Sequence, residues 1–282
     1  MPDPASARTI TTADGVRLAA WDEGDGPPIV FVHEFGGDAS SWDGQVRAFR
    51  STQRCVTFNA RGYPPSDVPD SPDAYSQQHA REDVLAVMDG LGLERATLVG
   101  LSMGAFAVLH VALTAPQRVS TLVVAGIGYG AELDRQATFR DRMRANADAI
   151  ERDGITAFAD TYSHDPARIQ LETKDPAAFE AQRARLAAHS ARGSANTMRG
   201  VQGKRPSVLE LTDQLRALRV PTLIIEGGLD TEARAGTAHL KATVPNAELL
   251  TIADAGHLLN LEHPVLFDKV VRNFIERSER RS

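Results

Sequence analysis

The sequence predicts an α/β protein whose mostly parallel, doubly wound sheet has about eight strands, with a helical segment inserted after the sixth strand. Short apolar runs alternate with helical patterns as far as residue 128, and the same alternation resumes at residue 219. Between these parts, residues 129–218 lose the strand-like runs and become rich in Ala, Arg, Asp and Glu at helical spacing. We therefore expect a core formed by residues 1–128 and 219–282, interrupted by a helical cap at 129–218.

The first part of the core begins with two strand-like segments, residues 8–12 and 16–22, on either side of an Asp14-Gly15 turn. This pattern predicts a β-hairpin at one edge of the sheet. Continuous apolar runs typical of buried parallel strands follow at residues 29–32, 55–58, 96–99 and 119–125. Helical patterns separate these runs at residues 41–50, 76–91 and 103–115.

The inserted segment places apolar side chains at helical spacing, which predicts a series of helices. They are expected around residues 139–150, 155–162, 179–189 and 209–218. Breaks are expected near residues 154, 164–166, 175–176 and 193–206, where Gly, Pro and Asp gather. In the second part of the core, strands are predicted at 221–225 and 247–252, and helices at 233–243 and 264–277.

The composition indicates a globular protein with a large core, because 42% of the 282 residues are hydrophobic and 24% are charged. The formal net charge is −6, and the longest basic stretch is the terminal segment 277–281, which argues against nucleic acid as a partner. No apolar run approaches the ~18 residues of a membrane span, and the start of the chain lacks the pattern of a signal peptide. We expect a cytoplasmic protein that acts on a small molecule away from membranes, and both a monomer and a homodimer remain open.

The sequence predicts no metal or cofactor. It contains no cluster with the spacing of metal ligands, and no Gly-x-Gly-x-x-Gly motif follows a predicted strand. The single cysteine, Cys55, cannot form an internal disulfide and falls in a predicted buried strand. We expect its side chain to be part of the core and not a nucleophile.

The sequence Gly-Leu-Ser-Met-Gly at residues 100–104 joins a predicted buried strand to a predicted helix. A serine at such a junction requires a sharp, strained turn, and the flanking glycines let neighbouring backbone pass closely. The turn exposes the hydroxyl of Ser102, and the helix N-terminus directs free N–H groups toward the same place, where they suit an oxyanion. Ser102 is therefore the candidate nucleophile.

An acid and a base follow two later strands, as Asp230 and His257. A serine hydroxyl needs an imidazole to take its proton, and that imidazole needs a carboxylate to fix its tautomer. Three other acids remain open as alternatives, namely Asp254, Glu132 and Asp134. Asp230 itself has an alternative role as a helix N-cap.

The order Ser102, Asp230, His257 and the glycines around them resemble the α/β-hydrolase superfamily, over residues 8–128 and 219–278. The resemblance implies the α/β-hydrolase fold, a serine-dependent, esterase-like or lactonase-like activity and a cap formed by the inserted helices. It also implies an oxyanion hole made by the backbone N–H groups of Met103 and Phe35. One residue departs from the family, because Glu34 follows His33 where a glycine is usual.

Glu34 has two interpretations. Its side chain points to solvent without effect, since a carboxylate beside an oxyanion would oppose catalysis, and this is the favoured expectation. Alternatively it bonds to a loop or cap group, holds the Phe35 N–H in place and discourages anionic substrates. His33 is expected to shape the loop through hydrogen bonds. Three aromatic residues, Tyr129, Phe158 and Tyr162, are candidates for lining a substrate pocket, with packing of the cap on the core as the alternative.

Three functions compete at this point. The first is a cofactor-independent hydrolase that cleaves an ester, thioester or lactone through an acyl-enzyme. The second is carbon–carbon bond hydrolysis, or lyase or oxygenase chemistry without a cofactor, with the same three side chains. The third is a ligand receptor that keeps the triad for binding. Labelling of Ser102 by a serine-directed phosphonate separates the first from the third.

Overall fold

The computed structural model describes residues 6–280 and contains one eight-stranded sheet in the order β1-β2-β4-β3-β5-β6-β7-β8. The strands are β1 (Arg8–Thr11), β2 (Arg17–Glu23), β3 (Pro28–Val32), β4 (Arg54–Phe58), β5 (Ala96–Leu101), β6 (Val119–Ala125), β7 (Thr222–Gly227) and β8 (Glu248–Ile252). The hairpin β1–β2 is antiparallel and joins β4 in antiparallel fashion, while all other pairs are parallel. The predicted fold class, including the edge hairpin, is confirmed.

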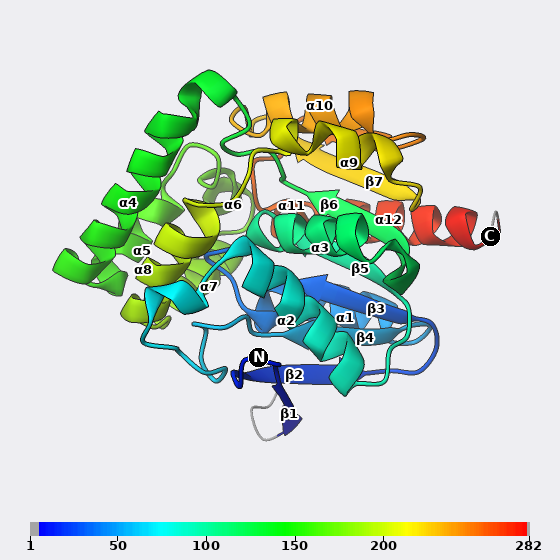
Figure 1. Cartoon of the computed structure of the whole chain (residues 1–282). Helices are drawn as coiled ribbons and strands as arrows, with labels where there is room; N and C mark the ends of the chain where they lie inside the picture. Colours follow the sequence, from blue (N-terminus) through cyan, green and yellow to red (C-terminus); the bar gives the residue numbers. More distant parts are fainter. Residues whose placement is uncertain (1–5, 281–282) are drawn as a thin grey trace.

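Two layers of helices cover the sheet (Figure 1). On one face, α2 (Gln77–Gly90), α3 (Met103–Thr114), α9 (Thr212–Ala217) and α10 (Arg234–Thr243) contribute to one apolar cluster. On the other, α1 (Asp43–Phe49), α11 (Leu259–Glu262) and α12 (Pro264–Glu279) contribute to a second. Because strands β3 to β7 alternate their side chains between two apolar layers, their sequences are continuously hydrophobic. Cys55 is part of the second cluster, as expected, and burial raises its pKa to about 12.

The helices of the inserted segment gather at one end of the sheet, on the left in Figure 1. They are α4 (Gln136–Asp153), α5 (Ile155–Ser163), α6 (Gln170–Lys174), α7 (Pro176–Ala187) and α8 (Ala191–Thr197). While Leu171 of α6 and Phe179 of α7 belong to the second cluster, apolar side chains of α4, α5, α7 and α8 form a third cluster with Phe35, Tyr63 and Met103. Those three residues lie in or beside loops that leave the carboxyl ends of β3, β4 and β5, so the helices lie over the end of the sheet where α/β proteins bind ligands.

The expected break at residues 193–206 is wrong over residues 193–202. Residues 191–197 form α8, and a π-helical turn, Met198–Gln202, continues from it. The glycines there serve close packing: a Cβ atom on Gly193 would lie 2.1 Å from the carbonyl oxygen of Gly62, and one on Gly200 would lie 2.1 Å from that of Tyr75. A glycine inside a helix is thus explained by a neighbouring backbone, which a single sequence does not reveal.

The last predicted helix of the insertion, α9, packs with the sheet. Leu211, Leu215 and Leu218 belong to the apolar cluster that also contains α2 and α3. Within the described residues, no helix is long and apolar enough to cross a membrane. The first five residues, expected not to belong to a signal peptide, and Arg281 at the end of the basic segment lie outside the described residues.

Candidate active site

Ser102 lies on a strained turn between β5 and α3. Its φ angle is +52° and its ψ angle −112°, a conformation that non-glycine residues rarely adopt. The cost of such a conformation is about 1–3 kcal/mol, which the surrounding structure must offset. The Ser102 N–H donates to the carbonyl oxygen of Ala125 at 2.8 Å, so the turn is fastened to the end of β6.

The two glycines that flank Ser102 are required by close backbone contacts. A Cβ atom on Gly100 would lie 2.4 Å from backbone atoms of Gly104. One on Gly104 would lie 2.1 Å from the carbonyl oxygen of Val32, at the end of β3. Both distances are far below contact distance, so the sequence Gly-x-Ser-x-Gly is the pattern that this strand–turn–helix geometry permits.

Asp230 and His257 meet at the ends of β7 and β8. His257 Nδ1 donates to Asp230 Oδ2 at 2.6 Å, and both side chains are fully buried. The Tyr129 hydroxyl donates to the other carboxylate oxygen, Oδ1, also at 2.6 Å. Burial alone would raise the pKa of Asp230, but the charge and hydrogen bond of His257 and the hydrogen bond of Tyr129 hold it below its ordinary value. The carboxylate therefore stays ionised and keeps the Nδ1–H tautomer of His257.

The other ring nitrogen of His257 is free. Nε2 is buried and has no hydrogen-bond partner among residues 6–280. A Cβ atom on Gly126 would lie 3.3 Å from His257 Nδ1 and 3.2 Å from Leu101 Cδ1. The imidazole therefore lies at the end of β6, beside the residue that precedes Ser102, with an unprotonated nitrogen available to accept a proton.

The loop that carries His257 is held by backbone and carboxylate groups. The His257 N–H donates to the carbonyl oxygen of Ala167 at 2.6 Å, in the inserted segment. The carboxylate of Glu262 accepts hydrogen bonds from the N–H groups on both sides, Gly256 at 2.8 Å and Leu258 at 3.0 Å. These contacts fix the position of the imidazole independently of Asp230.

The alternative acids lie elsewhere. The Asp254 side chain is 71% exposed and its carboxylate lies 3.2 Å from His263 Nε2. Glu132 pairs with Arg135 at 3.3 Å on the surface, and Asp134 is also exposed. Of the four carboxylates considered from the sequence, the structure brings only Asp230 to His257.

Among residues 6–280, no hydrogen bond is donated by the backbone N–H groups of Phe35 and Met103, the two candidate oxyanion-hole residues. Met103 is the first residue of α3, where a helix leaves its N–H groups unbonded, and neither amide donates to another residue within the described range 6–280. The Tyr63 hydroxyl donates to the Phe35 carbonyl oxygen at 3.1 Å and lies 3.9 Å from Met103 Sδ. The two candidate oxyanion-hole residues are thus connected through one buried tyrosine.

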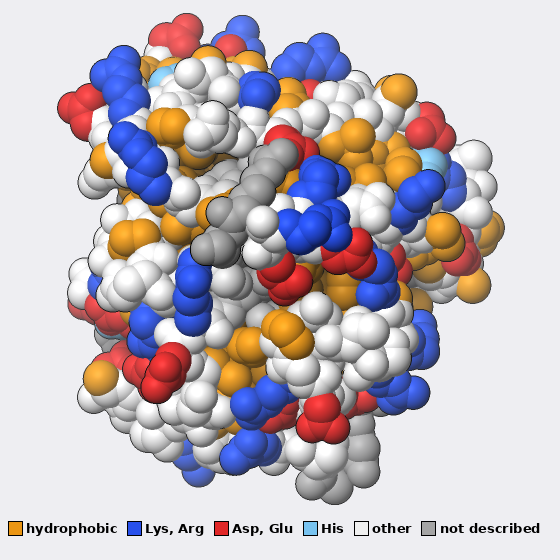
Figure 2. Space-filling model, turned by 90° about the vertical axis from the view of Figure 1, so that its right-hand side faces the viewer, with side chains coloured by type: hydrophobic (Ala, Val, Ile, Leu, Met, Phe, Trp, Pro, Cys, Tyr) orange, Lys and Arg blue, Asp and Glu red, His pale blue; other side chains and the backbone are white. Residues whose placement is uncertain are grey.

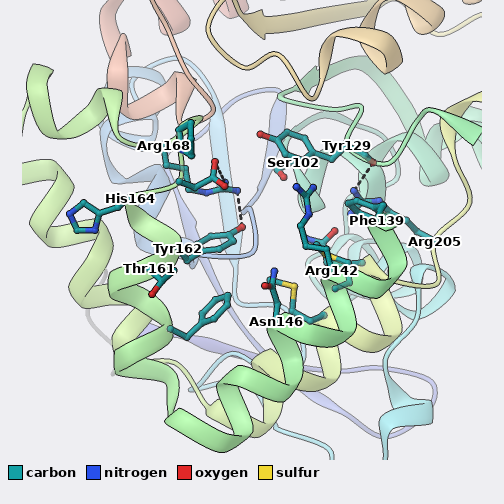
Figure 3. A pocket seen from close by; sticks show the side chains of 16 residues that line it. Ser102, Tyr129, Phe139, Arg142, Asn146, Thr161, Tyr162, His164, Arg168 and Arg205 are labelled. Carbon is teal, nitrogen blue, oxygen red and sulfur yellow. Dashed lines mark hydrogen bonds and ion pairs between the residues drawn. The ribbon is translucent and has the colours of Figure 1, made fainter. Parts of the chain in front are cut away.

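A cavity of about 390 Å³ opens above Ser102, between the sheet and the inserted helices. This volume suits a small organic molecule. Figure 3 shows the lining residues, which come mainly from α4, α5 and the segments after them. All three aromatic candidates line it, as Tyr129, Phe158 and Tyr162. Phe158 and Tyr162 stack with ring centroids 5.2 Å apart.

Comparison with known proteins decides the family. A family model described as "alpha/beta hydrolase fold" matches residues 27–264. The chain belongs to this family of α/β hydrolases. It is 30% identical over 273 residues to a protein of Bacillus subtilis named putative 2-succinyl-6-hydroxy-2,4-cyclohexadiene-1-carboxylate synthase, covering 94% of this chain and 97% of the relative.

Two further relatives also span nearly the whole hydrolase. The 3-oxoadipate enol-lactonase 1 of Acinetobacter baylyi is 27% identical over 278 residues, covering 95% of this chain and 96% of the relative. The crystal structure of a hydrolase from Pseudomonas aeruginosa superimposes with a TM-score of 0.85 at 29% identity, covering 97% of this chain and 99% of the other. The protein is therefore an enzyme of the α/β-hydrolase class that acts on small molecules.

The expectation that Glu34 points to solvent is wrong. Its side chain is 2% exposed, and its carboxylate accepts a hydrogen bond from the Gly36 N–H at 2.7 Å. The other oxygen accepts from Gln182 Nε2 on α7, also at 2.7 Å. Glu34 therefore connects the loop that carries Phe35 to the inserted helices, because Gln182 supplies a partner that no local pattern shows.

His33 shapes the same loop, as expected. Its Nδ1 lies 2.7 Å from the carbonyl oxygen of Glu34, and its Nε2 accepts from the Ala60 N–H at 3.1 Å. These two contacts assign the proton to Nδ1. Burial lowers the pKa of His33, so the ring stays neutral and acts as a brace between two loops.

Sequence reasoning missed three arginines of the cavity, Arg142, Arg168 and Arg205. They come from a segment with many arginines at helical spacing, most of which pair with surface carboxylates, so nothing in the pattern sets these three apart. Within the described residues, no group of three or more His, Cys, Asp or Glu side chains is arranged to hold a metal ion.

Proposed function

We propose that this α/β hydrolase cleaves a small-molecule ester, thioester or lactone through an acyl-enzyme formed on Ser102. The observation that carries the proposal is the buried Asp230–His257 hydrogen bond of 2.6 Å, which leaves His257 Nε2 as a free base beside the strained serine turn. The relatives named as a hydrolase and an enol-lactonase support the same reaction class.

In the first step His257 Nε2 takes the proton of the Ser102 hydroxyl while the oxygen attacks the substrate carbonyl carbon. The carbonyl oxygen becomes an oxyanion, which the N–H groups of Phe35 and Met103 stabilise. The imidazolium then gives its proton to the leaving alcohol, thiol or ring oxygen, and an acyl-enzyme remains. Water, deprotonated by His257, attacks this ester and releases the acid and the serine.

Asp230 and Tyr129 act on the base. Asp230 keeps the proton on Nδ1 and stabilises the positive charge that His257 acquires in each half-reaction. Tyr129 assists by donating a hydrogen bond to the second carboxylate oxygen of Asp230, which holds the carboxylate in place. Asp230 is fully buried and Tyr129 is half-buried, so the field between them acts in a region of low dielectric constant.

The inserted helices act as a cap that selects the substrate. Their side chains form the walls of the cavity, while Ser102 lies at its floor. Substitution of Phe158 or Tyr162 is therefore expected to change the preference among esters of different acyl size more than it changes the melting temperature.

The reaction is tested by following para-nitrophenyl butyrate hydrolysis and by labelling with a fluorophosphonate. Turnover in the wild type, with a single label on Ser102 located by peptide mass spectrometry, is the expected result. Intact binding of a ligand without labelling or turnover would make the protein a receptor. A His257→Ala variant that still labels at the wild-type rate would contradict the role of the base.

A second function is favoured by the Bacillus subtilis relative, which is named as a synthase and matches along nearly the whole chain. In a lyase without a cofactor, His257 and Ser102 would remove a proton from carbon, and the same two amides would stabilise the resulting enolate. No acyl-enzyme forms in such a reaction. Rapid quenching with para-nitrophenyl butyrate followed by mass spectrometry of the intact protein tests for the acyl adduct, which the hydrolase route predicts and which accumulates when deacylation is the slower half-reaction. Release of the free acid at each turnover then supports the hydrolase.

A further inference from the structure

The cavity above Ser102 contains more positive than negative charge, although the chain as a whole is acidic. Its charged lining consists of Arg142, Arg168 and Arg205 against one carboxylate, Asp165. On the face of the molecule shown in Figure 2, basic and acidic side chains are interspersed. The net formal charge of the protein is −6, so the excess of arginine is local to the cavity.

Arg205 is buried without a counter-ion. Its side chain is 6% exposed, and no carboxylate lies within 4.0 Å of it among the described residues. Its guanidinium lies over the ring of Phe106, with Cζ 3.9 Å from the ring centroid, and Nη2 donates to the Tyr129 carbonyl oxygen at 3.0 Å. Nη1 is buried and has no hydrogen-bond partner within residues 6–280.

A guanidinium removed from water is costly unless an anion or several acceptors compensate for the lost hydration. Burial lowers the pKa of Arg205 to about 9, so the group is still positively charged at neutral pH. One neutral carbonyl and the face of an aromatic ring leave most of that charge without compensation. Arg205 lines the cavity above Ser102, so an anionic ligand in that cavity is the candidate for the missing partner.

Arg168 has a similar position on another wall. Its side chain is 7% exposed, Nη2 donates to the Tyr162 hydroxyl at 2.7 Å, and Nε is buried without a partner within the described chain. Its nearest carboxylate, Asp165, lies 3.7 Å away, beyond hydrogen-bond distance. In Figure 3, Arg168 lies on one side of Ser102 and Arg205 on the other.

Arg142 lines the same cavity but differs in one respect. Its guanidinium makes two hydrogen bonds to the carboxylate of Glu232, at 2.8 and 2.6 Å. This pair joins α4 to the loop after β7 and neutralises the charge of Arg142. The positive charge that remains for a ligand is therefore mainly that of Arg205, together with that of Arg168, whose contact with Asp165 is long.

We propose that Arg205 and Arg168 form a carboxylate-binding site, and that the substrate of this enzyme is a small ester or lactone that also carries a carboxylate. This inference rests on the proposed function for its reaction. For its substrate class it rests on the guanidinium group of Arg205, which has no counter-ion, and on that of Arg168, whose one ion pair is long and whose Nε has no partner within the described residues. A planar guanidinium binds a carboxylate through charge-assisted hydrogen bonds and with fixed geometry. The carboxylate is thereby held at a set distance from the serine.

The contacts of the buried Glu34 agree with this assignment. They match the alternative interpretation that Glu34 bonds to loop and cap groups, and the proposal departs only from its expectation that Glu34 discourages anionic substrates. Its carboxylate is occupied by the Gly36 N–H and the Gln182 amide, and Glu34 is not part of the cavity wall that contains Ser102. A discrimination against anions by Glu34 would require its charge to face the ligand. The groups that face the ligand are arginines.

The test compares two esters that differ in charge and little in size, mono(para-nitrophenyl) adipate and its neutral methyl ester. We expect the wild type to prefer the anion in kcat/KM by about tenfold or more. Arg205→Met is expected to lower kcat/KM for the anion by about 30-fold or more and for the neutral ester by less than about threefold, because only the anion loses a buried charge pair. Arg168→Met is expected to follow the same pattern.

The matched control is Arg183→Met on α7, which removes one positive charge from the same group of helices. Arg183 pairs with Asp160 and Glu180 on the surface and does not line the cavity. Its ratio of anionic to neutral kcat/KM is expected to stay within about twofold of the wild type, because exposed charges are screened by salt. The preference of the wild type should also persist at high salt, since a buried pair is screened less.

Adipate itself, as an inhibitor of neutral-ester hydrolysis, gives a readout that does not depend on the acyl group. It is expected to compete in the wild type and to lose most of its inhibition in Arg205→Met. If Arg205→Met does not fold, Arg205→Lys replaces it, and it should weaken the anion preference while keeping the charge.

Three outcomes would overturn the inference. They are equal kcat/KM for the two esters in the wild type, equal losses on both esters in Arg205→Met and Arg168→Met, or the same loss of preference in Arg183→Met. Equal losses would assign Arg205 to holding the Tyr129 backbone alone. Failure of the proposed function looks different, because then neither ester is hydrolysed, while adipate binding measured by calorimetry still depends on Arg205.

Discussion

The floor and the walls of the cavity differ in how completely their polar groups are hydrogen-bonded. At the floor, both carboxylate oxygens of Asp230 accept hydrogen bonds, from His257 and Tyr129, backbone hydrogen bonds close the loops around them, and only the proton-accepting Nε2 of His257 has no partner within the described residues. On the walls, Arg168 and Arg205 are buried with N–H groups left without a partner. A paired network fixes geometry, whereas an unpaired charge selects a ligand. The floor is therefore expected to set the rate for every substrate and the walls to set the choice among substrates.

A third buried arginine, Arg61, lies away from the cavity and shows how a guanidinium with a structural role is paired. Arg61 is 3% exposed, and it donates to both carboxylate oxygens of Asp83 at 2.9 and 2.6 Å and to Asp14 at 2.8 Å. Burial alone would lower the pKa of Arg61, but these two acids raise it above its ordinary value. Arg205 has no carboxylate partner among the described residues. An arginine that is paired like Arg61 holds loops together, whereas an arginine that is placed like Arg205 can bind an anionic ligand.

The largest effect is expected at the floor, from Ser102→Ala. Loss of the nucleophile should lower kcat by about 10⁶ on anionic and neutral esters alike, since a triad acts as a unit. The melting temperature should stay unchanged because the turn is kept. Ser102→Gly should be as inactive but more stable by about 1 kcal/mol, because glycine adopts a positive φ without strain. A variant that lost only the anionic ester would contradict the separation of floor and walls.

Asp230→Asn is expected to lower kcat by about 10⁴, because the amide favours the wrong tautomer of His257. Asp254→Asn is the control, with an exposed carboxylate in the neighbouring loop. Its kcat should stay within about twofold of the wild type, as for other surface substitutions. The measurement is kcat of the two variants on one neutral ester. A larger loss in Asp254→Asn than in Asp230→Asn would assign the role of the acid to Asp254.

Tyr129→Phe is expected to lower kcat by about tenfold, since it removes an outer hydrogen bond to the acid. Without that donor the carboxylate of Asp230 becomes more basic, because the hydrogen bond of Tyr129 is among the groups that lower its pKa. A more basic Asp230 stabilises the charged form of His257. The acidic limb of kcat against pH should therefore move to higher pH, which a purely structural role of Tyr129 would not produce.

Glu34→Gln should have an effect on kcat no larger than that of Tyr129→Phe, a fall of at most about tenfold through displacement of the Phe35 amide. The Glu34 carboxylate now accepts hydrogen bonds from two N–H donors, those of Gly36 and Gln182. A glutamine at this position would turn its own N–H group toward one of these donors, so one of the two hydrogen bonds would be lost. The fall should be equal for anionic and neutral esters. The control is Glu180→Gln, an exposed glutamate on the same helix as Gln182. A gain on anionic esters would instead support the interpretation that Glu34 repels them.

The core of the fold follows from the sequence because its signals are local. Apolar strands, Gly-bearing turns and helix patterns each occupy a few adjacent residues, and the position of Ser102, Asp230 and His257 at strand ends is visible in them. The cavity walls do not follow, because their properties depend on partners far away in the chain. Glu34 is separated from Gln182 by 148 residues, and whether an arginine is paired depends on which carboxylate the fold brings near. Gly193 and Gly200 illustrate the same limit, since the neighbouring backbones that require them belong to residues 62 and 75.

The hydrogen bond between the His257 N–H and the Ala167 carbonyl oxygen has a consequence for how such an enzyme changes its specificity. It joins two main-chain groups, so no exchange of side chains in the inserted helices can remove it. Residues such as Phe158, Arg168 or Arg205 are free to vary while the histidine loop keeps its anchor. In a chimera whose whole inserted segment comes from another protein, a backbone carbonyl has to lie at the position of the Ala167 carbonyl. Point substitutions leave this carbonyl in place. Point substitutions in the cavity walls are therefore a safer route to new substrates than exchange of the whole inserted segment.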